Sequence, residues 1–533
     1  MVLVNRQAEL LLINSAFEAL HNHGNKDLSF TPIIDFFGVA GIGKTAILEY
    51  IEEQCKQRQI RYILIRASQN ASHFSREIVR QLAERYNIRL NSSVEEENLS
   101  QQSLDAIKIL LEQGIAVMIL DSVDTTNEDL LERIAATLRD AINDKKLFVV
   151  LASERGLLFD FERSISRQLT SLQLKPLDRK SCELYLDVVK PPLEPKIRQY
   201  IFDWTNGYPL AMEVMTSAMA EQKLDPTRPA DQKVLVGLLI ERVIDQGVFA
   251  KLTPSQQSRY KDALTALSVP RHFSLSIMQE LIERFAPELK RESNLAYMRL
   301  PKSIKNDTDV LNWNRLRGGY SIDIPIRNIF LLKIRVEQTE RYSALHEFLA
   351  QLNKALADKI VDDDQIGYLC EYLYHSAYTK SEQEFIQILE QVLLKMAEMS
   401  FNSIESFKMI RTYLEELLQD NEFKKELGER ILVVQSLIYR HLAETSRKEA
   451  RTTLGEDHFY HVKNFFIYVV KDPKVTDVHP IWTPAVQNIL AEELSGHTTQ
   501  FVEELLNSEE LEEALGNRFD LLRKLISEIS LEG

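Results

Sequence analysis

One segment of the chain combines glycines, a lysine and a hydroxyl residue in a pattern suited to binding phosphate. Residues 38–45 read Gly-Val-Ala-Gly-Ile-Gly-Lys-Thr, which fits G-x-x-x-x-G-K-[ST], and they lie between an apolar run and a helical pattern. Glycines in such a loop let backbone N–H groups approach phosphate oxygens, while Lys44 reaches the outer phosphates and the Thr45 hydroxyl binds Mg²⁺. The predicted phosphate-binding residues are Gly38, Ala40, Gly41, Ile42, Gly43, Lys44, Thr45 and Ala46.

Acidic residues that suit a metal and an attacking water follow a second apolar run. Residues 116–120 are Ala-Val-Met-Ile-Leu, and Asp121 comes directly after them. Asp121 is the candidate Mg²⁺ residue, directly or through water, and Asp124 is the candidate general base. In the alternative interpretation, both acids only begin a loop and cap the next helix.

An arginine follows a third apolar run, at residues 147–151. In an open parallel sheet, ligands bind beyond the carboxyl ends of the strands, so Arg155 is predicted to contact the γ-phosphate. Its alternative is an ordinary surface arginine. The predicted catalytic set is Lys44, Asp121, Asp124 and Arg155.

These residues need a sheet that brings strand ends together, and the first 250 residues predict one. Short apolar runs alternate with amphipathic stretches, which is typical of a parallel sheet with helices on both faces. We expect strands over residues 33–37, 62–65, 116–120 and 147–151, and helices over residues 46–58, 71–86, 103–113 and 128–142. The predicted fold class is an α/β P-loop NTPase core followed by helical domains.

The remaining residues predict three further domains. Helical patterns over 178–248 indicate a helical lid, and helices followed by a hairpin around the basic turn 315–319 indicate a winged helix. Beyond Arg341 the pattern is almost uniformly helical, as in 385–399, 404–418 and 502–525, without a clean 34-residue repeat. The predicted domains are 1–170 for the nucleotide-binding core, 171–250 for the lid, 251–340 for the winged helix, and 341–533 for a helical, solenoid-like sensor.

Composition narrows the class of protein. The chain has 533 residues, 44% hydrophobic and 27% charged, with 17 Gly, 16 Pro and 3 Cys, which excludes collagen-like and low-complexity classes. Few and separated cysteines, no 18-residue apolar run and no signal-peptide pattern favour a cytoplasmic protein without a membrane segment. The net charge of −15 argues against a whole-body nucleic-acid binder, although residues 251–340 carry 15 Lys+Arg against 10 Asp+Glu, a net of +5.

Taken together, the motifs resemble the STAND class of signal-transduction ATPases, which includes the NB-ARC and NACHT branches. Residues 4–10, Val-Asn-Arg-Gln-Ala-Glu-Leu, are similar to the family's N-terminal segment, so the resemblance places Asn5 and Arg6 at the adenine pocket. Arg155 matches the sensor arginine, and residues 174–177 are similar to the entry into the lid. Residues 206–211, Asn-Gly-Tyr-Pro-Leu-Ala, are similar to the family's G-L-P-L-A motif, whose proline packs against adenine; Pro209 is that proline.

Two departures from the family pattern are informative. Ser122 follows Asp121 where NB-ARC proteins usually have a second acid, whereas the small residue and the acid at Asp124 match the NACHT branch. Asp323 falls where the family's winged helix often carries a histidine that contacts the ADP β-phosphate, and an acid cannot make the same contact.

The resemblance implies a slow ATPase that acts as a switch. ATP or ADP with Mg²⁺ would bind between core and lid, and the C-terminal helices would sense a protein or peptide. ATP would promote opening and homo-oligomerisation, with output to an effector in trans, as in bacterial antiviral or regulatory systems. Two alternatives stay open: a DNA-acting ATPase of the origin-recognition or transposition type, with a basic wing at Arg315 and Arg317, and a pseudo-ATPase scaffold.

Overall fold

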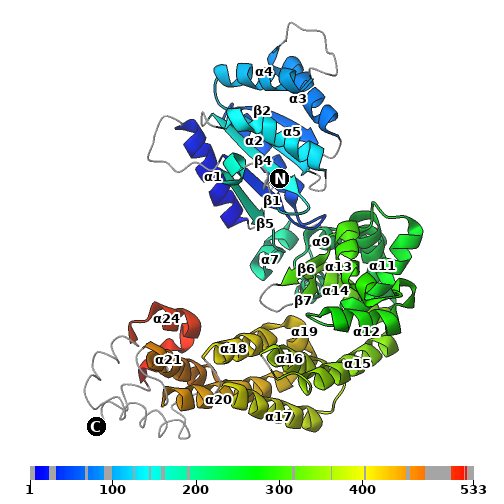
Figure 1. Cartoon of the computed structure of the whole chain (residues 1–533), viewed down its shortest axis with the longest axis vertical. Helices are drawn as coiled ribbons and strands as arrows, with labels where there is room; N and C mark the ends of the chain where they lie inside the picture. The colour runs from blue at the N-terminus through cyan, green and yellow to red at the C-terminus, as the bar shows by residue number, and fades with distance from the viewer. Residues whose placement is uncertain are drawn as a thin grey trace. The chain divides into compact units, whose positions relative to one another are not determined.

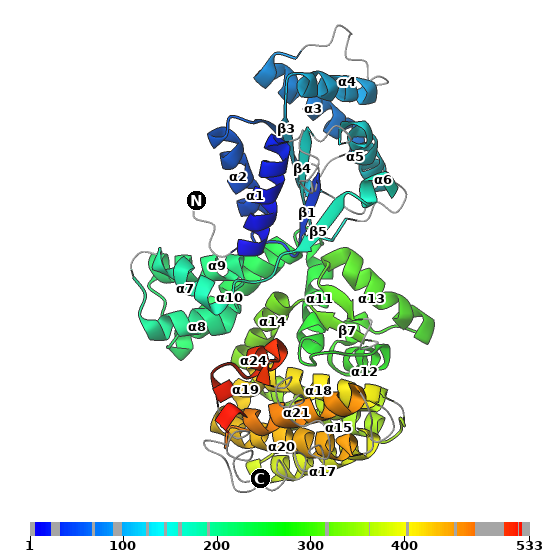
Figure 2. The same ribbon diagram turned by 90° about the vertical axis from the view of Figure 1, so that its left-hand side faces the viewer.

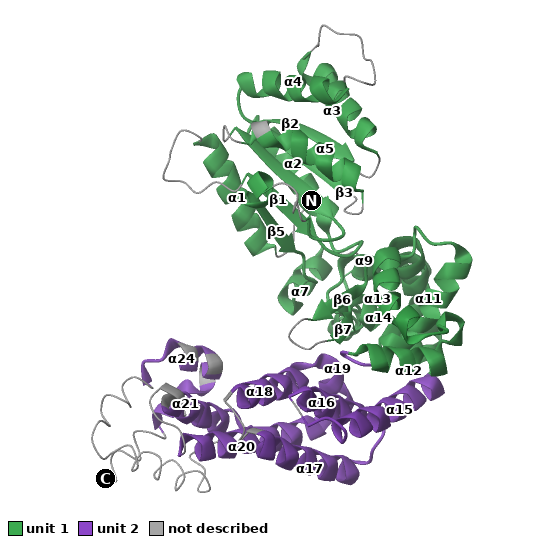
Figure 3. Cartoon of the chain, viewed as in Figure 1, with its two compact units in different colours: residues 1–268, 273–314, 319–338 green, residues 269–272, 315–318, 339–533 purple. Residues whose placement is uncertain are grey.

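The chain forms two compact units in a computed structural model (Figure 3). The first unit comprises residues 1–268, 273–314 and 319–338, and the second comprises 269–272, 315–318 and 339–533. The structure describes residues 6–22, 32–66, 70–88, 99–123, 127–142, 146–157, 163–188, 192–314, 319–361, 363–400, 404–451, 456–474, 506–520 and 522–524. The finer division into four domains stays a prediction.

A five-stranded parallel sheet is the centre of the first unit, which confirms the predicted fold class (Figure 1). Its order is β2-β3-β4-β1-β5, so β4 lies between β1 and β3. The strands are β1 Ile33–Phe37, β2 Arg61–Arg66, β3 Ala116–Val123, β4 Leu147–Ser153 and β5 Leu169–Gln173. The inner strands are apolar because helices cover both of their faces.

Among the five strands of this sheet, only β5 was not predicted from the sequence. Its residues, Leu-Thr-Ser-Leu-Gln, are partly or fully exposed, as expected for a strand at the edge of the sheet. A short edge strand with polar residues gives no continuous apolar run, and its place is set by pairing with β1.

Helices cover both faces of the sheet. Helices α1 and α2 lie on one side, and α5 and α6 lie on the other (Figure 2). Side chains of α3, α4 and α5 share a buried apolar cluster with the strands. The bounds are α1 Gln7–His21, α2 Lys44–Gln57, α3 Ala71–Tyr86, α4 Leu99–Glu112, α5 Glu128–Ala141 and α6 Arg163–Ser166. The four helices predicted in this region therefore form, with ends shifted by a few residues.

Four helices and a π-helical segment follow the sheet. Three of the helices begin with proline at the first helical position, where the missing N–H costs no hydrogen bond. The elements are α7 Arg179–Asp187, α8 Pro195–Thr205, α9 Pro209–Gln222, α10 Pro229–Leu239 and the π-helix η2 Ile240–Val248.

The rest of the first unit is helical apart from one hairpin. Strands β6 Leu311–Asn314 and β7 Gly319–Ile322 pair antiparallel, and Phe273 bridges to Tyr320. The helices are α11 Pro254–Leu267, α12 Leu275–Phe285, the 3₁₀-helix η3 Pro287–Leu289, α13 Asn294–Thr308 and α14 Ile324–Glu337. The turn that carries Arg315 and Arg317 lies outside the described residues. A winged-helix assignment for this region stays a prediction.

The second unit is helical throughout the part that the structure describes. A single cluster of buried apolar side chains joins its helices. They are α15 Thr339–Ala357, α16 Asp364–Ser376, α17 Glu382–Ser400, α18 Ile404–Gln419, α19 Asn421–Leu427, η4 Gly428–Arg430, α20 Ile431–Ala450, α21 Glu456–Lys471, α24 Glu509–Leu515 and η5 Gly516–Arg518. Within the described ranges, none of the chain's helices combines the length and apolar character needed to cross a bilayer.

Candidate nucleotide site

The predicted phosphate loop joins β1 to α2 at the carboxyl end of the sheet. Gly38, Gly41 and Gly43 all adopt positive φ angles, of 148°, 79° and 105°. The requirement for glycine is sharpest at Gly41, where a Cβ atom would lie 2.5 Å from the Cβ of Leu210. The loop ends at Lys44, the first residue of α2, so the positive end of a 14-residue helix dipole is directed at the loop.

Lys44 lies inside the loop. Its Nζ donates to the backbone oxygens of Gly38, at 2.5 Å, and Val39, at 3.0 Å. Burial lowers the pKa of Lys44, and carboxylates nearby oppose that shift; in order of effect they are Glu154, Asp121, Asp309 and Asp35. A partly desolvated ammonium interacts more strongly with an anion than one in bulk water does, so a phosphate group could replace the carbonyl partners.

Arg6, which directly precedes α1, connects this loop to the segment that follows β5. Its guanidinium donates to the backbone oxygens of Ile42 and Lys175, both at 2.7 Å, and pairs with Glu9 at 3.4 Å. Burial lowers the pKa of Arg6. The structure thus places Arg6 in contact with the phosphate loop, and its place at the adenine pocket, which the resemblance implies, stays a prediction. Asn5 lies outside the described residues.

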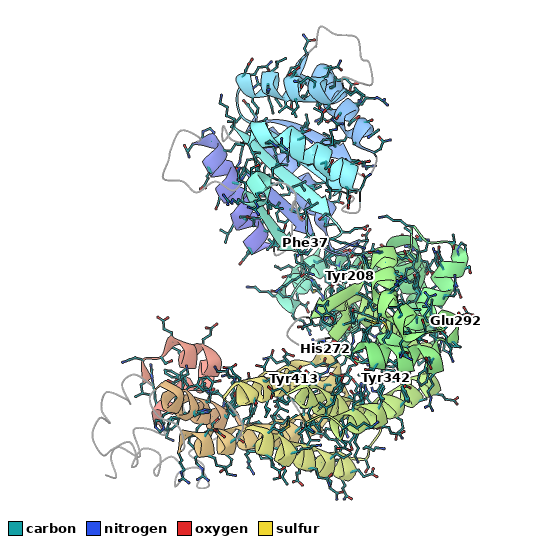
Figure 4. The ribbon with its side chains drawn as sticks, viewed as in Figure 1. Phe37, Tyr208, His272, Glu292, Tyr342 and Tyr413 are labelled. Atoms are coloured by element: carbon teal, nitrogen blue, oxygen red, sulfur yellow. The ribbon has the colours of Figure 1, made fainter. Side chains whose placement is uncertain are left out.

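The Gly-Tyr-Pro-Leu stretch of the lid contacts the phosphate loop directly. The Tyr208 hydroxyl, labelled in Figure 4, donates to the Ala40 carbonyl, and the Leu210 N–H donates to the Gly41 carbonyl at 3.2 Å. Pro209 lies between them as the first residue of α9. Glycine is required at position 207 because the backbone passes close to Leu177 there: a Cβ on residue 207 would lie 1.9 Å from the Leu177 carbonyl oxygen.

The predicted metal ligands are oxygen donors from two elements. Thr45 is exposed at the start of α2, and Asp121 is half-buried in β3, close enough to raise the pKa of Lys44. Strand β3 bulges after Leu120, and Ser122 has a positive φ of 57°. Hydroxyl and carboxylate oxygens suit Mg²⁺, which is held with phosphate oxygens and water in sites of this kind, so these two residues fit that ion. Asp124 lies outside the described residues.

Arg155 follows β4 and forms an ion pair that the sequence did not predict. Its Nε lies 2.5 Å from Oδ1 of Asp309, and its Nη2 donates to the Lys305 carbonyl at 2.5 Å. Asp309 ends α13 in the left-handed conformation, with φ of 54°. Burial raises the pKa of Asp309 to about 6, although Arg155 favours the charged form.

A cavity of about 90 Å³ adjoins this pair. It is lined by the phosphate loop, the turn after β4, the end of η2 and the end of α13. Its charged side chains come from Glu154, Arg155, Lys251, Asp307 and Asp309. The sequence alone does not identify Asp309, Asp307 or Lys251, because no local motif marks them. The π-helix η2, whose end lines the cavity, was not predicted either, since π-helices have no simple sequence pattern although they often occur at functional sites.

Asp323, predicted to replace the family's phosphate-contacting histidine, precedes α14. Its side chain makes no capping hydrogen bond, and its Oδ1 is buried without a hydrogen-bond partner. Burial raises the pKa of Asp323 to about 6, and the negative charge of Asp309 adds to the shift. The expectation that this position does not bind phosphate in the way a histidine would stays a prediction.

Comparisons with known proteins found several solved structures of low sequence identity to this chain. Structures similar to this chain include a CDC6P protein from Pyrobaculum aerophilum, with 14% identity, a TM-score of 0.34, and coverage of 63% of this chain and 94% of that one. Another is the Aeropyrum pernix ORC1 protein in complex with DNA, with 16% identity, a TM-score of 0.33, and coverage of 62% and 92%. A third is a Pyrococcus horikoshii STAND protein with a tetratricopeptide repeat sensor, with 12% identity, a TM-score of 0.31, and coverage of 99% and 81%.

A comparison with curated proteins gave no match. Residues 31–159, which span the phosphate loop, Asp121 and Arg155, match the family model of the AAA domain. The chain therefore carries an AAA-type P-loop ATPase domain.

Proposed function

We propose that this protein is a nucleotide-dependent switch of the STAND type, which binds ATP or ADP with Mg²⁺ and hydrolyses ATP slowly. The carrying observation is the ion pair between Arg155 and Asp309. Arg155 belongs to the matched ATPase domain, and Asp309 belongs to the helical region predicted to be a winged helix. A residue that can pair with either a carboxylate or a phosphate couples the state of the nucleotide to the position of that helical region.

Each predicted residue has a distinct task in this proposal. The loop backbone and Lys44 hold the phosphates, Thr45 and Asp121 hold Mg²⁺, and Arg155 contacts the γ-phosphate. Mg²⁺ supplies positive charge that offsets the negative charge developing on the phosphates during hydrolysis. Asp124 orients the attacking water.

The lid contacts support a linked movement of lid and loop. Because Tyr208 and Leu210 donate to carbonyls of the phosphate loop, a change in loop conformation alters the hydrogen bonds of the lid. Pro209 lies at this junction, in the position proposed to pack against adenine.

The C-terminal helices complete the proposed switch. Residues 341–533 sense a protein or peptide, and the ATP-bound chain assembles into a homo-oligomer that signals to an effector in trans, in bacterial defence or regulation. The net charge of −14 in this segment, from 20 Lys+Arg and 34 Asp+Glu, suits a protein partner better than nucleic acid.

The test is the mass of the purified protein by light scattering, with Mg²⁺–ADP and with Mg²⁺–ATP, together with the identity of any co-purified nucleotide. We expect a larger mass with ATP for the wild type and no change for Lys44→Ala. Lys56→Ala is the matched control, because Lys56 lies on the same helix and forms only an exposed ion pair with Glu52. If the mass of Lys44→Ala increased with ATP as much as that of the wild type, the proposal would be contradicted.

One observation favours the DNA-acting alternative. Trp313 on β6 is 53% exposed, and the residues that join β6 to β7 include Arg315 and Arg317. An exposed aromatic beside arginines suits contact with nucleic acid. Binding of a fluorescent DNA duplex at several salt concentrations discriminates, because phosphate contacts give a steep loss of affinity with salt, which Arg315→Ala/Arg317→Ala would reduce.

A further inference from the structure

Asp35 is a carboxylate in the middle of strand β1, which lies between β4 and β5. Its neighbours in the strand, Ile34 and Phe36, are fully buried apolar residues, and Asp35 itself is 0% exposed. Burying a carboxylate costs several kcal/mol unless hydrogen bonds compensate, and an apolar residue would satisfy the strand equally well. The presence of an acid here therefore points to a task other than sheet formation.

The hydrogen bonds of Asp35 are directed mainly at one segment. The Ser153 hydroxyl donates to Oδ1 at 2.8 Å, and the Leu157 N–H donates to Oδ2 at 2.8 Å. A longer contact, at 3.5 Å, comes from the Ser171 hydroxyl of β5. The two short bonds therefore hold both ends of residues 153–157, the turn that carries Arg155.

The same turn is tied to the phosphate loop. The Ser153 carbonyl accepts from the Gly38 N–H at 3.3 Å, and the Ser153 hydroxyl also contacts the Arg155 carbonyl. Gly156 packs against the ring of Phe37, the last residue of β1, where a Cβ would lie 3.2 Å from the ring. Ser153 thus links the first glycine of the loop, the backbone of Arg155 and Asp35.

We propose that Asp35 is a positioning residue that fixes Arg155 relative to the phosphate loop, through Ser153 and the Leu157 N–H. Asp35 touches no phosphate; it determines whether the Arg155 backbone is held in place to present the guanidinium to the γ-phosphate. The inference rests on the proposed contact of Arg155 with that phosphate. Misplacing a contact group by about 1 Å reduces its effect by up to about a hundredfold, so a measurable loss is expected.

The experiment compares affinities for Mg²⁺–ATP and Mg²⁺–ADP by calorimetry in the full chain. We expect Arg155→Ala to weaken ATP binding about tenfold and to leave ADP binding unchanged. Asp35→Asn and Ser153→Ala should each weaken ATP binding about fivefold without altering ADP binding. Ser171→Ala is the matched control, because it removes a contact with Asp35 from a strand that does not carry Arg155, and its affinities should stay within about twofold of the wild type.

A double variant separates positioning from general support of the sheet. Asp35→Asn combined with Arg155→Ala should bind ATP no more weakly than Arg155→Ala alone, since the two residues act through one guanidinium. The inference is overturned if Asp35→Asn weakens ATP and ADP equally, if its effect adds fully to that of Arg155→Ala, or if Ser171→Ala matches Ser153→Ala. Should Asp35→Asn fail to fold, Ser153→Ala and its double variant with Arg155→Ala decide the question alone.

The Arg155→Ala measurement also tests the proposed function itself. If Arg155→Ala does not reduce the preference for ATP, the sensor role of Arg155 is wrong and the positioning role falls with it. If Arg155→Ala behaves as expected while Asp35→Asn and Ser153→Ala do not, only the positioning role is wrong.

Discussion

Two clusters of ionisable residues in this chain each contain an arginine–carboxylate ion pair and differ in its surroundings. The first, the nucleotide-site cluster, consists of Lys44, Arg155, Asp309 and Asp323 around the phosphate loop. The second, the helical cluster, consists of Arg271, Glu371, His346 and His375 in the second unit. In the helical cluster, Arg271 and Glu371 are 7% and 8% exposed and form an ion pair at 2.8 Å. Both histidines are fully buried, with their Nδ1 atoms 3.0 Å apart.

The two ion pairs differ in whether a ligand could contact them. Arg271 is enclosed by Glu371 and lies over the ring of Tyr374, 5.0 Å from its centre. Arg155 and Asp309 instead line a cavity, and their pair is 24% and 15% exposed. An enclosed pair contributes to the fold of its unit, whereas a pair that borders a cavity and the phosphate loop can exchange one partner for a ligand.

The largest expected effect tests the structural character of the helical cluster. Glu371→Ala leaves the Arg271 guanidinium buried without its carboxylate, which should lower the free energy of unfolding by about 4 kcal/mol. Chemical denaturation measures the change, and the exposed pair of Lys395 and Asp358 supplies the control, because Asp358→Ala should cost under about 1 kcal/mol. A Glu371→Ala variant as stable as the wild type would remove the distinction between the clusters.

The next effect tests the nucleotide-site cluster through ligand-induced stability. Mg²⁺–ADP at about 100 times its dissociation constant should stabilise the wild type by about 2.7 kcal/mol. Lys44→Ala should abolish this gain without lowering stability in the absence of nucleotide, since Lys44 donates only to carbonyls of its own loop. Thermal denaturation with and without nucleotide gives both values. Equal stabilisation of Lys44→Ala and the wild type would show that the nucleotide does not bind at this loop.

A smaller effect is expected from releasing Arg155. Asp309→Asn removes the charged partner, and asparagine tolerates the left-handed backbone of this position. The affinity for Mg²⁺–ATP should rise about fivefold, roughly 1 kcal/mol, with no change for Mg²⁺–ADP. Asp307→Asn is the control, because Asp307 lines the same cavity but bonds the Tyr260 hydroxyl. A gain in both variants, or in neither, would refute competition for Arg155.

The last effect concerns the pH dependence of stability. The pKa of Asp323 is raised to about 6 in the folded chain, so the folded state holds a proton that the unfolded state releases between pH 4 and 6. The contribution of Asp323 to stability is therefore present below pH 4 and is lost as the pH rises to 6. Asp323→Asn avoids this loss, so its stability relative to the wild type should improve by up to about 2 kcal/mol from pH 4 to pH 7. Denaturation curves at both values measure the change, and a constant difference would contradict it.

Much of the nucleotide site could be predicted from the sequence because its requirements are local. The glycines, Lys44 and Thr45 are consecutive, and the loop needs their backbone freedom and side chains wherever it occurs. Asp121 and Arg155 could be singled out because each follows a continuous apolar run, and the ends of parallel strands gather at one edge of the sheet. The strands β1, β2, β3 and β4 were predictable because each contains such an apolar run.

The remaining features depended on the tertiary structure. Asp309 pairs with Arg155 across 154 residues, and Asp35 bonds Ser153 across 118 and Leu157 across 122. No local pattern encodes such pairs, since they arise from the order β4-β1-β5 and from the packing of α13. The sequence by itself thus determined which residues form the predicted phosphate loop, because that motif depends on neighbouring residues. Only the tertiary structure decided what holds Arg155, because that depends on which distant segments the sheet and its helices bring together.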